Sequence, residues 1–313
     1  MKTIFKIINR TIKFLRNKDY RFRLLSEIGL YDRMPDKEYL FRRYKSMMGK
    51  ELNLCNPRTF NEKIQWLKLY NRNPEYTLMV DKVEVKKWVA KVIGEQYVIP
   101  TIGVWDKPED IDFDSLPNQF VLKCNHNSGI GMYICQDKNK INKRKILKNL
   151  KKGLRENKYL SEREWAYKNV KRRILAEKFM QDKESEALND YKFFCFNGEV
   201  KALYIATERQ NPCDETRFDF FDADYNHLEF TNAHPNAIYP PAKPHNFELM
   251  KKIACKLSKG IPHVRVDLYE VDGQVFFGEM TFYHMSGMFP FSPEEWDYTF
   301  GSWITLPQRT NEK

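Results

Sequence analysis

The segment from His263 to Phe282 holds the residues of this sequence that are best suited to chemistry. Asp272-Gly273 favours a tight turn between two strands, and apolar residues take the even-numbered positions on both sides of it. These apolar residues are Val264, Val266 and Leu268 before the turn and Phe276, Met280 and Phe282 after it. If both sets face the core, paired residue numbers must sum to an even number. This predicts a three-residue loop that pairs Glu270 with Gln274.

This register gathers four polar side chains on the other face of the hairpin, namely Arg265, Asp267, Glu279 and Thr281. It places Arg265 opposite Glu279 and makes Asp267 a diagonal neighbour of Glu279. Two carboxylates side by side repel each other unless a positive charge lies between them. Mg²⁺ is the usual cation where phosphates are also bound. An ordinary ion pair of Arg265 with Glu279, beside a surface Asp267, is the alternative.

A second candidate site is a glycine-containing loop between two short predicted strands. Gly129 and Gly131 let backbone amides approach an anion, Ser128 adds a hydroxyl donor, and Lys123 supplies a point charge for a phosphate. No Gly-Lys-Ser/Thr leads into a helix and a strand follows the loop, so the segment is neither a P-loop nor a Rossmann loop. A hairpin that folds over phosphates and a simple hairpin turn both fit it.

The remaining reactive residue types give weaker signals. Six scattered cysteines show no Cys-x-x-Cys pair and no zinc spacing, which favours reduced, buried thiols. His126 beside the glycine loop and His284 after the hairpin are candidates for phosphate and acceptor contacts. Asp222-Ala223-Asp224 follows an apolar strand, as an acidic metal motif would, but it also has the composition of a turn.

The elements that must position these residues are helices first and an α+β body afterwards. Thr59-Phe60-Asn61-Glu62 is a capping box that opens a helix, and a second helix runs from about Asp81 to a stop at Gly94. The other expected elements are strands at 97–100, 120–123, 132–135, 173–179, 191–196, 199–206 and 218–221, helices at 143–157 and 247–259, and the hairpin at 264–282.

Size and composition exclude several classes of protein. A chain of 313 residues favours two or three subdomains, and 42% hydrophobic residues exclude a wholly disordered chain. No apolar stretch approaches the roughly 20 residues of a membrane span. The net charge is +11, but no nucleic-acid-binding signature accompanies it. We expect a cytoplasmic protein that binds no nucleic acid.

The first 23 residues are unusually basic, with eight basic side chains and one acid. Phe5, Ile8, Ile12 and Leu15 share one face of a predicted helix. Such a helix can lie on an anionic membrane surface through residues 1–23. It can equally pack its apolar face on the body of the protein, and composition does not separate the two.

Six motifs follow one another along the chain. They are Pro57-Arg58-Thr59-Phe60-Asn61-Glu62-Lys63, Asp81-Lys82, Phe120–Lys123 with Ser128–Met132, Leu175-Ala176-Glu177-Lys178-Phe179-Met180, Asp190-Tyr191-Lys192-Phe193, and Arg265 with Asp267 and Glu279. In this order they resemble the TupA-like branch of the ATP-grasp superfamily, which is found with polysaccharide-biosynthesis genes. The resemblance extends from about Asn56 to Pro307. It implies an α+β ATP-grasp fold, in which two α+β subdomains clasp ATP, with a helical N-terminal part.

The resemblance also implies a division of the chain and a role for individual residues. The implied parts are a basic amphipathic helix at 1–30, a helical region at 31–80, a lid subdomain with the phosphate loop at 81–176, and a catalytic subdomain with the metal-binding hairpin at 177–313. The implied ATP-binding residues are Lys82, Lys123, Ser128, Gly129, Gly131, Glu177, Phe179 and Asp190. The implied catalytic residues are Lys192 and Arg265, and the implied metal ligands are Asp267, Glu279 and Thr281. Thr281 stands where the wider superfamily has Asn.

The implied activity is that of an ATP-dependent carboxylate–amine ligase that forms ADP through an acylphosphate. Its cofactors would be ATP and Mg²⁺. Its carboxylate and amine substrates would include a sugar acid or a peptidyl acceptor, and one of them would be a glycan or a glycan precursor. The reaction would belong to capsule or cell-surface polysaccharide biosynthesis. The basic helix would then contact the cytoplasmic face of the membrane. Two alternatives stay open: a glycosyltransferase that uses a nucleotide-sugar with Asp222 and Asp224, and a scaffold with an inactive nucleotide site.

Overall fold

The structure, a computed structural model, describes residues 10–182, 188–207 and 215–309. Two antiparallel sheets form its centre, and their strand orders are β11-β10-β5-β6-β7-β8 and β1-β4-β2-β3. The large sheet contains β5 (Asp190–Phe196), β6 (Glu199–Thr207), β7 (Arg217–Asp222), β8 (His227–Leu228), β10 (Val264–Val271) and β11 (Gln274–Thr281). The small sheet contains β1 (Thr101–Trp105), β2 (Phe120–Cys124), β3 (Tyr133–Cys135) and β4 (Ile174–Lys178). A separate short pair joins β9 (Thr231–Asn232) to β12 (Phe291–Ser292).

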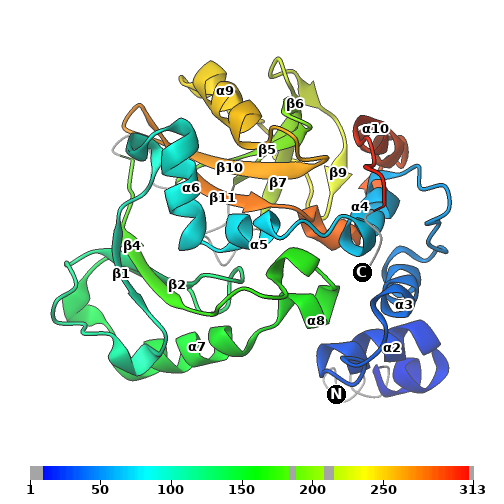
Figure 1. The fold of residues 1–313 in the computed structure, drawn as a ribbon, viewed down its shortest axis with the longest axis horizontal. Coiled ribbons are helices and arrows are strands. Elements are labelled where there is room, and N and C mark those ends of the chain that lie inside the picture. Colours follow the sequence, from blue (N-terminus) through cyan, green and yellow to red (C-terminus); the bar gives the residue numbers. More distant parts are fainter. Residues whose placement is uncertain (1–9, 183–187, 208–214, 310–313) are drawn as a thin grey trace.

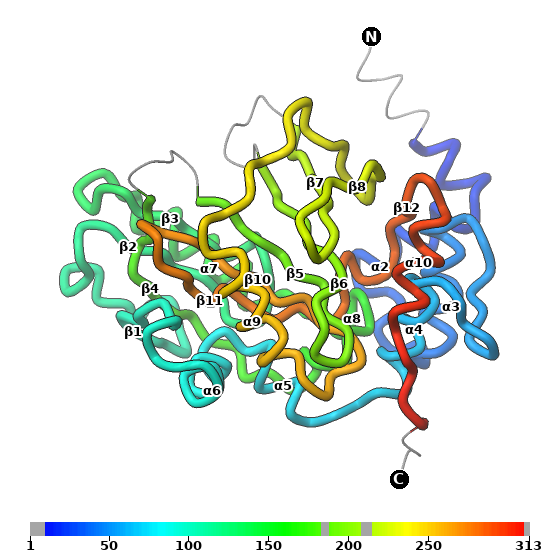
Figure 2. The backbone as a smooth tube through the Cα atoms, turned by 90° about the horizontal axis from the view of Figure 1, so that it is seen from above, coloured from blue at the N-terminus to red at the C-terminus, as the bar shows by residue number. Residues whose placement is uncertain are grey.

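Helices surround these sheets, and residues 10–16 are helical as well. The α-helices are α2 (Lys18–Glu27), α3 (Asp36–Met48), α4 (Phe60–Tyr70), α5 (Glu75–Val80), α6 (Glu84–Ile93), α7 (Lys143–Arg155), α8 (Lys158–Glu162), α9 (Phe247–Leu257) and α10 (Glu295–Trp303). Short 3₁₀ turns are η1 (Glu95–Tyr97), η2 (Pro108–Asp110), η3 (Lys138–Lys140), η4 (Trp165–Tyr167) and η5 (His284–Gly287). In both views the small sheet lies at the opposite end of the molecule from α2 and α3 (Figures 1 and 2).

Most of the predicted elements are confirmed. Thr59 and Glu62 form the expected capping box at the start of α4, and Gly94, with φ of 114°, ends α6. The strand predicted at 97–100 is wrong, because η1 occupies its start and β1 begins only at Thr101. Pro100 has no backbone N–H to give to a ladder, so the strand starts after it. Strands β8, β9 and β12 are two residues long, too short for a periodic pattern.

Each sheet packs on its own hydrophobic core among the described residues. The core of the small sheet includes Phe120, Leu122 and Ile174 together with Ile146 and Leu150 of α7. The larger core joins the six-stranded sheet to α4, α9 and α10. Two cores agree with an α+β fold of more than one subdomain. The boundaries predicted for these parts stay predictions, and the one between 176 and 177 falls inside β4.

The β10–β11 hairpin reaches the predicted arrangement by a different register. Its turn has two residues, Asp272 and Gly273, whose φ angles of 49° and 74° are those of a type I′ turn. Val271 therefore pairs with Gln274, and the predicted three-residue loop is wrong. Next to the turn the numbers of paired residues sum to an odd number, and a bulge makes this sum even further along the hairpin. Leu268 pairs with Phe277 whereas Asp267 pairs with Glu279, so that Gly278 is the extra residue.

The bulge decides which residues face each other. Asp267 lies directly opposite Glu279, not diagonal to it, and Arg265 lies opposite Thr281, not Glu279. All four side chains still share one face of the sheet. The prediction that Phe276 faces the core is wrong, because before the bulge the two-residue turn directs Val275 and Phe277 to the core and leaves Phe276 half-buried. A β-carbon on Gly278 would come within 2.8 Å of the Tyr269 ring and 3.0 Å of the Asp267 carbonyl oxygen. Glycine is therefore needed at the bulge.

We predict that Gly278→Ala lowers the free energy of unfolding by about 1–3 kcal/mol, because the added methyl group has no room beside Tyr269. Urea denaturation followed by circular dichroism measures this. Gly49→Ala is the control, since its β-carbon would meet nothing within 4 Å and only its φ of 71° opposes it. A Gly278→Ala variant as stable as Gly49→Ala would contradict the close packing of the bulge.

Candidate functional site

A cleft of about 600 Å³ is lined by the large sheet, by the β2–β3 loop of the small sheet and by the N-terminal helices. The large sheet contributes Lys192, Tyr204, Phe218, Arg265, Glu279 and Thr281, and the β2–β3 loop contributes Asn127 and Ser128. Lys82, just before α6, lines the same space. Six of the thirteen predicted site residues therefore meet in one cleft: Lys82, Ser128, Lys192, Arg265, Glu279 and Thr281. The other seven do not line it.

Asp267 lies behind the wall of this cleft and is fully buried. Arg265 grips it with two hydrogen bonds of 2.7 Å, from Nε to Oδ1 and from Nη2 to Oδ2. Lys192, its partner across β5, also contacts Oδ2 and lies 2.5 Å from Asp190. Burial would lower the pKa of Lys192, but Asp190 and Asp267 outweigh it and raise this pKa, so the lysine keeps its charge. Asp267 therefore neutralises two buried cations.

Arg265 is held on every side. Its Nη1 donates to the Tyr204 hydroxyl at 3.2 Å and to Nδ1 of His284 at 3.1 Å, and its Nη2 donates to the Thr281 hydroxyl at 3.0 Å. Because arginine can only donate, Nδ1 of His284 must accept and its Nε2–H is left to donate to Asn232 Oδ1 at 3.0 Å. Burial lowers the pKa of His284 well below its usual value, which agrees with this neutral form. His284 thus positions the guanidinium.

Glu279 is the carboxylate that faces the cleft. Its side chain is 28% exposed, lies 3.0 Å from Lys82 and is 3.6 Å from Arg265. Burial would raise its pKa, but Lys82, Lys192 and Arg265 together lower this pKa strongly, so Glu279 is ionised. Lys82 also donates to the carbonyl of Asn127 at 3.0 Å and so joins the glycine loop to the hairpin.

In sites that bind phosphates, Mg²⁺ takes one or two carboxylates plus phosphate and water oxygens as ligands. Glu279 fits, because its ionised carboxylate lines the cleft. Asp267 and the Thr281 hydroxyl both accept hydrogen bonds from Arg265, so either could bind the ion only if Arg265 released it. In residues 10–182, 188–207 and 215–309 no group of three or more His, Cys, Asp or Glu side chains is placed to hold a metal.

The two glycines of the β2–β3 loop have different environments. Both have positive φ, 85° at Gly129 and 81° at Gly131. A β-carbon at Gly129 would meet nothing within 4 Å, whereas one at Gly131 would come within 2.7 Å of Cys124 Sγ and 3.0 Å of the Gly153 Cα of α7. Gly131 therefore packs the loop on α7, and Ser128 with Gly129 forms its exposed tip.

Lys123 and Glu177 meet on the neighbouring strands β2 and β4 of the small sheet, and neither lines the cleft. Lys123 lies 2.5 Å from Glu177, and Lys86 of α6 lies 2.6 Å from the same carboxylate. Burial would raise the pKa of Glu177, but the two lysines outweigh it and lower this pKa. No sequence signal singled out Lys86, because it lies on a charged helix. Phe179 follows β4 and is half-buried.

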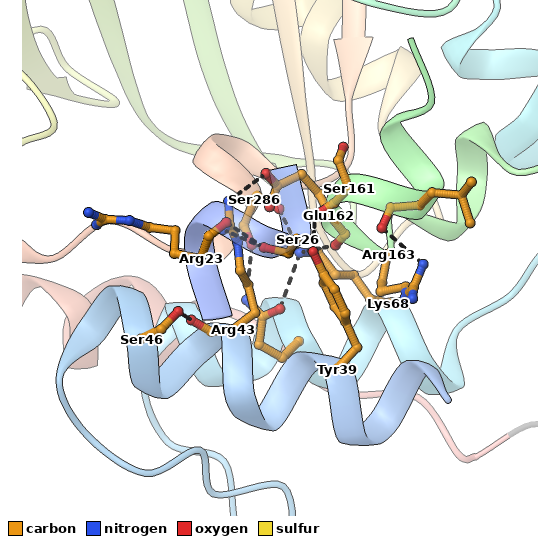
Figure 3. A network of polar contacts seen from close by, with 12 residues as sticks. Arg23, Ser26, Tyr39, Arg43, Ser46, Lys68, Ser161, Glu162, Arg163 and Ser286 are labelled. Atoms are coloured by element: carbon orange, nitrogen blue, oxygen red, sulfur yellow. Dashed lines mark hydrogen bonds and ion pairs between the residues drawn. The ribbon is translucent and has the colours of Figure 1, made fainter. Parts of the chain in front are cut away.

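The N-terminal helices build a part of the cleft that sequence reasoning missed. Lys68 of α4 is only 1% exposed and donates to the Ser286 carbonyl and hydroxyl, each at 2.7 Å, and to the Glu162 carbonyl at 3.0 Å. Figure 3 shows these residues gathered with Arg43, whose Nη2 donates to Glu162 at 3.2 Å. Ser286 has φ of 56°, a left-handed conformation that these bonds hold in place. Lysine in a polar helix normally indicates a solvated face, so no pattern in the sequence marked Lys68.

The weaker candidates lie elsewhere. Asp222 ends β7, and its carboxylate accepts hydrogen bonds from the backbone amides of Asp224 and Asn226, at 2.9 and 2.8 Å, as in a turn. His126 is buried and contacts the Glu156 carbonyl at 3.1 Å. Trp296 and Trp303 pack against the large core. The five cysteines of the described residues are free, as predicted; Cys124, Cys135 and Cys195 are also buried, whereas Cys255 is half-buried and Cys55 is exposed. Cys213 lies outside the described residues.

Comparison with known proteins now decides the family. The sequence model of the TupA-like ATP-grasp family matches residues 62–305. The chain belongs to the TupA-like ATP-grasp family. The two sheets and the cleft are therefore those of an α+β ATP-grasp fold, as the motifs predicted. No curated protein matches the sequence.

Several solved structures resemble this TupA-like protein at low identity. The D-alanine–D-alanine ligase from Bacillus anthracis, complexed with ATP, is 15% identical, with 65% of this chain and 53% of that chain covered and a TM-score of 0.37. The corresponding ligase from Helicobacter pylori is 13% identical, with 79% and 69% covered and a TM-score of 0.43. N5-carboxyaminoimidazole ribonucleotide synthetase from Thermus thermophilus is 12% identical, with 66% and 45% covered and a TM-score of 0.38. The chain spans about half the length of the first of these enzymes.

We predict that Asp267→Asn lowers the free energy of unfolding by about 3–5 kcal/mol, because it leaves Arg265 and Lys192 buried without their shared counter-charge. Chemical denaturation measures the loss. Glu199→Gln is the matched acid-to-amide control, since Glu199 pairs with Lys201 at an exposed position. It should stay close to the wild type. Equal stability of the two variants would show that the charge of Asp267 is not needed to stabilise the buried Arg265 and Lys192.

We predict that stability falls as the pH drops below about 6.5. Burial lowers the pKa of His126 to about 4, so between these values the unfolded chain binds a proton that the folded chain does not. The single histidine accounts for about 2 kcal/mol between pH 7.5 and pH 5. Denaturation at both pH values should therefore show a smaller loss in His126→Gln than in the wild type. His245→Gln, at an exposed position, should keep the wild-type loss, and an identical loss in all three proteins would contradict the prediction.

Proposed function

We propose that this chain is an ATP-dependent carboxylate–amine ligase. The supporting observation is that Lys82, Ser128, Lys192, Arg265 and Glu279, from separate segments, line one cleft in a member of the ATP-grasp family. The volume of about 600 Å³ is typical of small-molecule sites and leaves room beside the phosphates for a second substrate.

The proposed reaction has two steps. The bond between the γ-phosphorus and the bridging oxygen of ATP breaks as a substrate carboxylate takes the phosphoryl group, giving ADP and an acylphosphate. An amine nitrogen then attacks the acyl carbon, the carbon–oxygen bond to phosphate breaks, and the amine loses a proton. Such transfers depend on positioning and on charge neutralisation. Lys82, Lys192 and Arg265 would neutralise the transferring group, and Ser128 at the exposed loop tip would donate to a phosphate.

The remaining predicted residues have supporting roles in this proposal. Mg²⁺, held by Glu279 and phosphate oxygens, would neutralise the phosphates when bound, with Asp267 and Thr281 as the further candidate ligands. Gly129 gives the loop its freedom of backbone. Lys123, Glu177 and Phe179 would meet the nucleotide on the small-sheet side, and Asp190 would hold Lys192 or approach the ribose.

The proposed substrate is a sugar acid or peptidyl acceptor of cell-surface polysaccharide synthesis at the cytoplasmic membrane face. Within the described residues no helix is long and apolar enough to cross a bilayer. Ile12 and Leu15 are 44% and 67% exposed beside Lys13 and Arg16, which suits contact with an anionic membrane surface. Phe5 and Ile8 of the same predicted face lie outside the described residues. A glycosyltransferase is less well supported, because the Asp222 carboxylate is engaged in a turn.

We predict that Glu279→Gln slows ATP-dependent ADP formation by about 10²–10³, because it removes the carboxylate that faces the cleft. A coupled ADP assay with mixtures of amino acids and uronic acids measures the rate, and titration of ATP with and without Mg²⁺ measures the metal dependence of binding. Glu229→Gln, at an exposed position, is the control and should match the wild type. Wild-type turnover and wild-type Mg²⁺ dependence in Glu279→Gln would refute the metal assignment.

A further inference from the structure

A second cavity shares lining residues with the catalytic cleft, and none of the predicted site residues lines it. This second cavity has a volume of about 530 Å³ and is lined by Arg10, Tyr20, Arg23, Leu24, Glu27, Arg43 and Met47. Arg43 and Met47 of α3 also line the cleft. Two residues of α3 therefore border both spaces. We call the second space the distal cavity.

The residues that line the cleft include members of the hairpin, of η4 and of α3, whose Arg43 also lines the distal cavity. Tyr167 of η4 lines the cleft between the hairpin and the N-terminal helices, and its buried hydroxyl, whose pKa burial raises, feels the charges of Glu164, Glu279 and Arg265. Beyond it Glu164 and Ser286 line the cleft, followed by Glu162 in contact with Arg43. Together the residues that line the two spaces therefore extend from the predicted phosphoryl-transfer residues to α2 and α3, the helices at the right of Figure 1.

The distal cavity is basic. Arg10, Arg23 and Arg43 line it against one acid, Glu27. Arg43 is more than nine-tenths buried, and its Nε has no hydrogen-bond partner among the described residues although its two Nη atoms contact Ser26 and Glu162. Figure 3 shows the guanidinium of Arg23 pointing away from the labelled network. No acidic side chain among the described residues pairs with Arg10 or Arg23. Arginine in this state is suited to bidentate binding of carboxylates and phosphates.

We propose that the distal cavity binds anionic groups of an extended acidic glycan whose reactive end lies at the hairpin. This inference rests on the proposed ligase function and adds the substrate class: a chain of several sugars, not a free sugar acid. The anionic groups are carboxylates of uronic acids or phosphodiesters between sugars, since arginine recognises both in the same way.

The aromatic content of the cavity favours a glycan over a nucleic acid. Single-stranded nucleic acids bind by stacking successive bases on aromatic side chains. Tyr20 is the aromatic residue among those lining the distal cavity, and its ring already lies under Lys13 Nζ at 4.9 Å and Arg23 Cζ at 5.4 Å. It therefore offers little free surface for a base, whereas Arg10 and Arg23 offer positive charge for an anionic group.

The test is direct binding, measured without ATP by fluorescence polarisation at low salt with labelled trigalacturonate and with a labelled glycerol-phosphate trimer. The test variant is Arg10→Glu/Arg23→Glu, and Arg10→Gln/Arg23→Gln is a milder form should charge reversal disturb folding. The matched control is Arg144→Glu/Lys148→Glu on the exposed face of α7, which changes the charge equally. Thermal melting checks the fold of each variant, and ATP affinity is measured in parallel.

We expect at least one of the two probes to bind the wild type, a tenfold or greater loss of affinity in the test variants, and a change within twofold in the control. The probe that binds identifies carboxylates or phosphodiesters as the source of charge. Failure of both probes, equal losses in test and control variants, or tighter binding of a single-stranded oligonucleotide with the same sensitivity would overturn the inference. ATP affinity should be unchanged in all variants. Absence of ATP binding in the wild type would instead contradict the proposed function, and the two failures are therefore distinct.

Discussion

The wall of the cleft depends on the compensation of buried charge around Asp267. Arg265 and Lys192 both lie in the interior of the large sheet, where an unpaired cation is very costly. The Asp267 carboxylate contacts both cations, and Asp190 adds a second negative charge beside Lys192. As a result Glu279, which lies directly opposite Asp267, is left turned towards the cleft and towards Lys82. Asp267 thus neutralises buried cations, whereas its neighbour Glu279 is available to a ligand in the cleft.

The N-terminal helices are part of the site, not an appendage to it. Gln65 and Lys68 of α4 donate to the carbonyl of Ser286, where the chain is left-handed after the hairpin. The other end of α4 is held by α10, since Asp297 accepts from the backbone and side chain of Asn61. The residues of the motif that begins at Pro57 therefore serve to pack α4 against α10, and none of them lines the cleft.

The glycine loop shows that similar residues can be required for different physical reasons. Gly131 allows the loop to approach α7 within contact distance of Gly153, so its role is packing. Gly129 lies in open space with positive φ, so its role is conformational. Gly278 belongs to the first kind, because its lack of a side chain admits the bulge that sets the hairpin register. The contacts that an added β-carbon would make at each glycine distinguish these roles, which the residue type alone does not.

The sequence by itself determined the family motifs, the main helices and strands, and the shared face of Arg265, Asp267, Glu279 and Thr281, because apolar alternation is a local property of the chain. It did not determine the two-residue turn and the bulge, since a three-residue loop gives the same parity without them. Only the tertiary structure brought Glu162 and Arg43 to the cleft, placed Lys68 behind Ser286 and Glu162, and gave Asp267 its two cations. Those contacts join segments far apart in the chain, and a charged residue in a helix looks the same whether folding buries it or not.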